Sequence, residues 1–118
     1  MKNIINVTLH EVTFQCGESG VCYTLEPSGV VINATPIEQE CAPHSCGVAL
    51  VRTTFVASAA EEEKVALLER DNPGAILAGS IIAAQAFPGR VFAMVPAPGF
   101  ERVPPAEKRM RDDKFTTF

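Results

Sequence analysis

Several features that would identify a function are missing from this sequence. No stretch approaches the roughly 18 uninterrupted apolar residues of a membrane-spanning helix. The longest apolar tract, residues 74–87, is interrupted by Ser80 and Gln85. The first residues alternate in polarity and include Glu11, unlike a secretory signal peptide. These absences predict a soluble, cytoplasmic protein that makes no membrane contact.

Positive charge is also scarce. Residues 1–100 hold five basic side chains against ten acidic ones, and the 118-residue chain has a formal net charge of −4. An acidic surface repels a phosphate backbone, so the sequence disfavours nucleic acid as a partner. The mixed charges of residues 101–118 are interpreted as a solvated tail, with contact to an anionic partner as the alternative.

Signatures of catalysis are missing too. The chain contains no G-x-S-x-G, no H-x-E…C-x-x-C and no paired carboxylates, and its two histidines are His10 and His44. Gly79 and Ser80 could place backbone N–H groups near an anion, but one glycine and one serine fall short of a phosphate-binding fingerprint. The sequence therefore names no catalytic residue and favours a binding protein over an enzyme.

The cysteines are the first candidates for a metal site. Cys16 and Cys22 are separated by five residues, and Cys41 and Cys46 by four, with His44 between them. Structural zinc sites usually place paired cysteines about two to four residues apart. The favoured interpretation is four unligated thiols and no cofactor. A zinc-stabilised module on these cysteines and a disulfide remain as alternatives.

The first half of the chain has strand patterns. Alternating, β-branched segments predict about four strands: residues 5–14, a hairpin over residues 21–37 that turns at residues 26–29, and residues 47–58. The last segment is apolar on both faces, which is typical of a central strand.

The sequence of the second half predicts a helix, a strand, a second helix and a second strand, in that order. The spacing predicts a helix over residues 58–74 capped by Ser58, a strand over 75–79, a helix over 80–87 capped by Ser80, and a strand over 90–97. The expected fold is α+β, with the helices packed on one face of a mostly antiparallel sheet and a parallel pair possible in the β-α-β part. Residues 1–100 would form this single domain, and residues 101–118 a Pro- and charge-rich tail.

Five side chains are candidate ligand-binding groups: His10, Arg52, Ser80, Gln85 and Arg90. The helix over residues 80–87 has almost no polar face, so we expect the sheet or a second subunit to enclose it, with Gln85 in an apolar setting. A charge at Arg52, inside an apolar strand, needs a carboxylate or lines a cleft. The hypothesis is that His10, Arg52 and Gln85 mark one polar site. The alternative is three separately satisfied residues.

Several segments resemble a group of small phage and prophage proteins, also carried in integron cassettes. The segments are IINVTLHEVTF, EPSGVV, GVALVRTTF, SIIAAQAFPGR and VPAPG, spread over residues 3–100. The chain departs from that pattern at Leu9, where the group has proline, and in the helix near residues 59–72, where the group has a short loop. The resemblance implies an origin in a mobile genetic element and supplies no activity.

Together these features predict a mobile-element accessory protein that binds a partner protein and self-associates. The alternative is a small-molecule (anion) binding protein or enzyme with a cleft near Ser80, Arg52 and His10.

Overall fold

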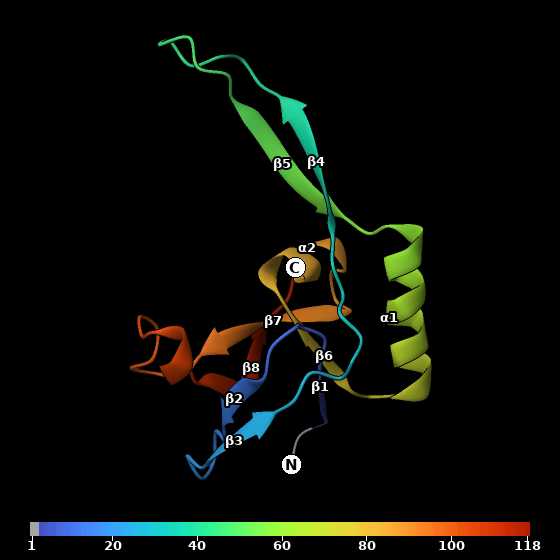
Figure 1. Ribbon diagram of the computed structural model, residues 1–118, viewed down its shortest axis with the longest axis vertical. Helices are drawn as coiled ribbons and strands as arrows, with labels where there is room; N and C mark the ends of the chain where they lie inside the picture. Colours follow the sequence, from blue (N-terminus) through green and yellow to red (C-terminus); the bar gives the residue numbers. More distant parts are fainter. Residues whose placement is uncertain (1–2) are drawn as a thin grey trace.

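The protein is built around a six-stranded mixed β-sheet (Figure 1). The computed structural model describes residues 3–118. The strands lie in the order β1-β6-β7-β8-β2-β3. They span Ile4–Asn6 (β1), Val12–Gln15 (β2), Cys22–Leu25 (β3), Ile76–Gly79 (β6), Val91–Pro96 (β7) and Met110–Thr116 (β8).

Two helices, α1 (Ala59–Asp71) and α2 (Ile81–Ala86), cover one face of this sheet. Leu77 of β6 packs in a cluster with helix residues such as Val65, whereas its neighbour Ala78 packs in a second cluster with Phe14. Since successive side chains of a strand point to opposite faces, the two clusters lie on opposite sides of the sheet. The second cluster joins residues of β1 and β3, the two edges of the sheet, so the sheet curls around it.

The α+β class and the helices of the second half agree with the sequence patterns. The side-chain oxygen of Ser58 accepts a hydrogen bond from the Glu61 backbone N–H (3.2 Å) at the start of α1. Ser80 caps α2 in the same way, through Ala83 N–H (3.1 Å). The parallel pair in the β-α-β part is β6 and β7.

The expected mostly antiparallel layout is wrong. The pairs β1/β6, β6/β7 and β2/β8 are parallel, and β7/β8 and β2/β3 are antiparallel. The physical reason lies in residues 5–14, expected to form one strand. They break after Asn6 into β1 and β2, which lie at different places in the sheet. The expected hairpin over residues 21–37 does not form either, because β3 pairs with β2 and β4 pairs with β5.

The C-terminal residues also differ from the expected tail. β8 lies between β7 and β2, inside the sheet, and its Asp112 is buried. A short 3-10 helix, η1 (Pro105–Glu107), precedes it. The domain therefore extends past residue 100. The charged residues of β8 make this segment resemble a solvated tail in the sequence. In the fold it is a strand, and its buried acidic residue Asp112 accepts hydrogen bonds.

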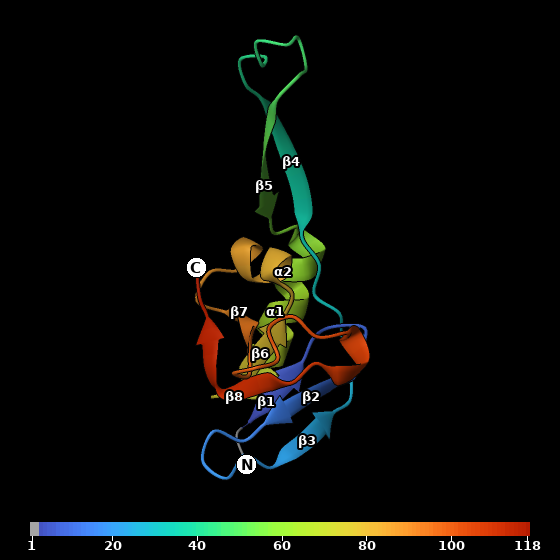
Figure 2. The same ribbon diagram turned by 90° about the vertical axis from the view of Figure 1, so that its left-hand side faces the viewer.

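The strands β4 (Thr35–Glu40) and β5 (Val51–Val56) form a separate antiparallel hairpin. Figures 1 and 2 show it standing clear of the body in two perpendicular views. We call residues 35–56 the arm. Every residue of β4 is exposed, as is every residue of β5 except the half-buried Phe55. The expected central strand is thus an exposed one, and its two apolar faces lack the cover that a central position would give.

Candidate functional site

The arm presents two chemically different faces. Thr35 pairs with Val56 and Gln39 with Arg52, and directly opposed residues of a hairpin share a face. One face therefore carries the exposed aliphatic residues Ile37, Leu50 and Val56 together with Thr35, Gln39, Arg52 and Thr54, and we call it the apolar face after its three aliphatic side chains. Arg52 is its single charged residue in β4 and β5. The opposite face carries Pro36, Glu38, Glu40, Val51, Thr53 and Phe55, and we call it the acidic face.

The base of the arm lies next to α2. β5 and α2 are in contact. Ala83 and Ala84 are fully buried, but Ile81 and Ile82 are 60% and 43% exposed. The predicted enclosure of this helix is thus incomplete, because the sheet covers its alanine side alone. Gln85 is exposed as well, rather than held in an apolar setting.

The arm gives the chain an unusually large surface. Its accessible surface is 7597 Å², whereas a folded monomer of this mass has about 6,200 Å². The radius of gyration is 16.5 Å, against about 13.5 Å for a compact domain of this length. About 1,400 Å² is therefore exposed in excess of what a compact chain would leave in contact with water.

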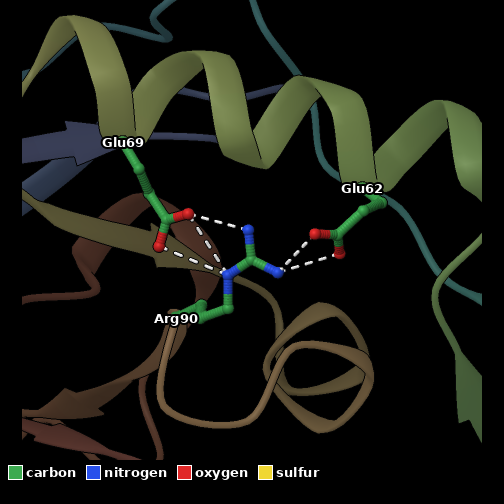
Figure 3. A network of polar contacts seen from close by, with 3 residues as sticks. All are labelled: Glu62, Glu69 and Arg90. Atoms are coloured by element: carbon green, nitrogen blue, oxygen red, sulfur yellow. Dashed lines mark hydrogen bonds and ion pairs between the residues drawn. The ribbon is translucent and has the colours of Figure 1, made fainter.

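Arg90 is engaged in ion pairs with α1 (Figure 3). Its guanidinium lies 2.6 Å from Glu62 Oε1 and 2.7 Å from Glu69 Oε1. The hydrogen bonds that Arg90 donates to Glu69, and then those to Glu62, raise the pKa of Arg90 above its already high ordinary value. These contacts attach the turn after α2 to the side of α1 that carries Glu62 and Glu69. A ligand-binding role for Arg90 stays a prediction.

His10 and Ser80, in contrast, line one cavity of about 510 Å³. We call it the sheet-edge cavity. Arg52, Gln85 and Arg90 are not among the described residues that line it. The structure thus brings together two of the five predicted site residues. Its other lining residues are Thr8, Glu11, Val12, Thr13, Met94, Pro105, Ala106, Lys108 and Met110.

Asn6, which sequence reasoning missed, shapes one wall of this cavity. Its buried side chain donates hydrogen bonds to the backbone oxygens of His10 (2.7 Å) and Leu25 (3.1 Å). Its side-chain oxygen accepts from the backbone N–H (3.0 Å) and the hydroxyl (2.6 Å) of Thr8. All its polar atoms are used, which fixes the loop from β1 to β2. A signal was available: asparagine is a turn-forming residue, but the alternating pattern around it concealed the break.

The four cysteines are free thiols in two separate places. Cys16 and Cys22 flank the β2–β3 turn, and Cys41 and Cys46 lie in the loop of the arm. Hydrogen bonding with Ser19 lowers the pKa of Cys16. Within residues 3–118, no group of three or more histidine, cysteine or acidic side chains is gathered as a metal site needs. The zinc alternative gains no support from this arrangement.

Comparison with protein-family models, with curated proteins and with solved structures finds no match to this chain. None of the helices in the described part of the chain is long and apolar enough to cross a membrane. The function is therefore argued from the arm, the exposed face of α2 and the sheet-edge cavity.

Proposed function

We propose that this protein is a self-associating binding module, and that the apolar face of the arm packs against a second copy of the chain. The observation that carries the proposal is the arm itself, whose apolar side chains lack cover from their own chain. Ile37, Leu50 and Val56 are 49%, 44% and 37% exposed. A lone two-stranded hairpin is marginally stable in water, so a partner that covers it would stabilise it.

The amount of exposed surface supports a second copy as that partner. A stable interface covers about 800 Å² on each side, and the chain exposes about 1,400 Å² beyond the compact expectation. In a two-fold dimer each copy contributes the same patch, so one apolar surface covers the other. Burial of each large apolar side chain contributes about 1.5–3 kcal/mol.

Charge supports the apolar face as the interface. Glu38 and Glu40 lie on the acidic face, and two copies joined by that face would bring four carboxylates together. Like charges close together in an interface are destabilising. The apolar face carries no acidic residue in β4 and β5, and its single charge is Arg52, so a contact through this face brings two like charges together instead of four.

The biological setting of the module is a further part of the proposal. The resemblance in residues 3–100 supports an accessory protein of mobile-element origin. Such a protein would bind another protein of its host element, with the dimer as the binding unit. The acidic body supports a protein partner over a nucleic acid.

The test is a sedimentation experiment on the wild type and two double variants. The variant Ile37→Asp/Leu50→Asp places two charges on the apolar face, and we expect the oligomer to dissociate into monomers. The matched control Val51→Asp/Thr53→Asp places two charges on the acidic face and should leave the wild-type mass. Thermal melts check that both variants keep a folded body. A wild type that sediments as a monomer at every concentration, or equal effects of both variants, would refute the proposal.

A further inference from the structure

We propose that the sheet-edge cavity binds a small organic acid, with its carboxylate held by Lys108 and His10 and its apolar body packed against Met94 and Met110. The proposal is independent of self-association, since the cavity is lined by the body of the protein and by none of the arm. Its volume of about 510 Å³ falls within the roughly 300–1,000 Å³ of small-molecule sites.

The cavity lies where this sheet is most suited to form one. Thr8 and His10 follow β1, and Ser80 follows β6 directly. The carboxyl ends of the parallel strands β1, β6 and β7 lie at the same end of the sheet. The start of β8, which is antiparallel to β7, lies at that end too. In open sheets with parallel strands, ligands bind in the crevice outside the carboxyl ends. The η1 turn, through Pro105 and Ala106, closes another side of this cavity.

The wall that carries His10 is held rigidly. The four hydrogen bonds of the buried Asn6 side chain fix Thr8, the His10 carbonyl and the end of β3 relative to one another. The His10 backbone N–H also donates to the Thr8 hydroxyl oxygen, at 3.4 Å. A site whose lining groups are held before the ligand arrives spends less conformational entropy on binding. The backbone of His10, a lining residue of the cavity, is therefore preorganised.

Lys108 is the cation among the described residues that line the cavity, and its charge favours an anionic ligand. Lys64, Arg70, Arg90 and Arg111 are engaged in ion pairs. Lys108 forms no ion pair with any of residues 3–118, and in the same range the His10 imidazole has no hydrogen-bond partner. Both are therefore available to a carboxylate, which pairs strongly with charged donors.

Glu11, the acidic residue that lines the cavity, has a hydrogen-bond partner. Glu11 hydrogen-bonds with Glu26, and this contact raises the pKa of Glu11. Two carboxyl groups that share a hydrogen bond retain a proton more readily than either alone. The Glu11 side chain is thus directed to Glu26.

The remaining lining explains why the ligand has an apolar body. Val12, Met94 and Met110 are half-buried, and their side chains contribute apolar surface to the cavity. Methionine side chains adapt to irregular apolar shapes. An inorganic anion would leave this surface wet, whereas an organic acid covers it and places its charge beside Lys108 and His10.

The test uses the full chain, isotope-labelled and titrated in an NMR experiment with phenylacetate and hexanoate. Phenylacetamide and phenethylamine serve as the neutral and cationic counterparts. We expect the acids to shift the amide signals of the cavity residues, and the amide and amine to bind at least about tenfold more weakly, as the loss of a charge-assisted contact predicts.

Two variants locate the binding site. Lys108→Met should weaken acid binding by about tenfold or more, whereas the matched control Lys114→Met, in β8, should not. Ala106→Trp fills the cavity without a change of charge and should also abolish binding. The proposal is overturned if neither acid binds, if the neutral amide binds equally well, or if acid binding survives both cavity variants. Because Ile37→Asp/Leu50→Asp leaves the cavity intact, that variant should bind the acids like the wild type, whatever its oligomeric state.

Discussion

At the scale of single residues, the carboxylate of Asp112 organises the turn between β2 and β3. Asp112 is buried and accepts hydrogen bonds from the Gly17 backbone N–H (3.0 Å) and the Tyr23 hydroxyl (2.9 Å). Loss of either partner would leave a buried polar group unpaired, which costs about 1–3 kcal/mol. This pairing allows an acid to lie inside the sheet.

Tyr23 offers a direct test of this arrangement. Burial, and then the hydrogen bond with Asp112, raise the pKa of Tyr23 well above its ordinary value of 10.0. Tyr23 is the single tyrosine and the chain has no tryptophan, so the ultraviolet absorbance of tyrosinate reports this group alone. We expect the folded protein to show no tyrosinate signal as the pH passes 10.

The pH dependence of the stability of the fold follows from the same shift in the pKa of Tyr23. Because the folded-state pKa is the higher one, the stabilisation from neutral Tyr23 is fully present below pH 10 and is lost as the pH rises through the folded-state pKa. Asp112→Asn should lower the pKa of Tyr23 toward 10, and the neighbouring Asp113→Asn should not. A wild-type Tyr23 that titrates near 10 would contradict the buried contact.

Asn6 and Asp112 also explain what residue patterns could not predict. Each is a polar residue whose side chain is buried and fully bonded, but in the sequence it resembles a residue at the surface. Asn6 therefore did not indicate the break between β1 and β2, and Asp112 did not indicate β8. Among the hydrogen bonds that permit their burial, the one from Asn6 to Leu25 joins residues 19 positions apart, and those of Asp112 join residues 95 and 89 positions apart, which no local pattern contains.

At the scale of elements, the sequence predicted the bounds of an element best where residues typical of its start and of its end were both present. The helix α1 has a serine cap, glutamates in its first turn and a stop near Asn72, so its bounds followed from the sequence. The strand β5 was predicted as a strand but in the wrong environment. Two apolar faces indicate that other residues must pack against the strand. They do not indicate whether those residues belong to the same chain or to another one.

The arm should behave as an independent unit of local stability. In the self-associated wild type we expect the amide hydrogens of β4 and β5 to be protected from exchange. In Ile37→Asp/Leu50→Asp the arm loses its cover, so these amides should exchange rapidly while those of β6 and β7 stay protected. Hydrogen-exchange mass spectrometry on both proteins measures this. Rapid exchange of the arm in the wild type, at concentrations where it self-associates, would contradict an arm interface.

At the scale of the whole molecule, the long, exposed shape is the feature that needs an explanation. The extents of 53 × 36 × 20 Å reflect one hairpin that projects from a curled sheet (Figure 2). Strand order and the projection of the arm depend on contacts between distant residues, so the sequence could not predict them. Of the predicted site, His10 and Ser80 meet at the sheet edge because β1 and β6 are parallel neighbours, whereas Arg52 belongs to the arm.

The most direct test of the central claim is an isotope-filtered NOE experiment on a mixture of methyl-labelled and unlabelled chains. The account predicts intermolecular contacts from the methyl groups of Ile37, Leu50 and Val56 to a second copy, with Ile81 and Ile82 as neighbours at the base of the arm. Intermolecular contacts confined to other surfaces, or none at all at high concentration, would contradict the proposed arm-mediated self-association.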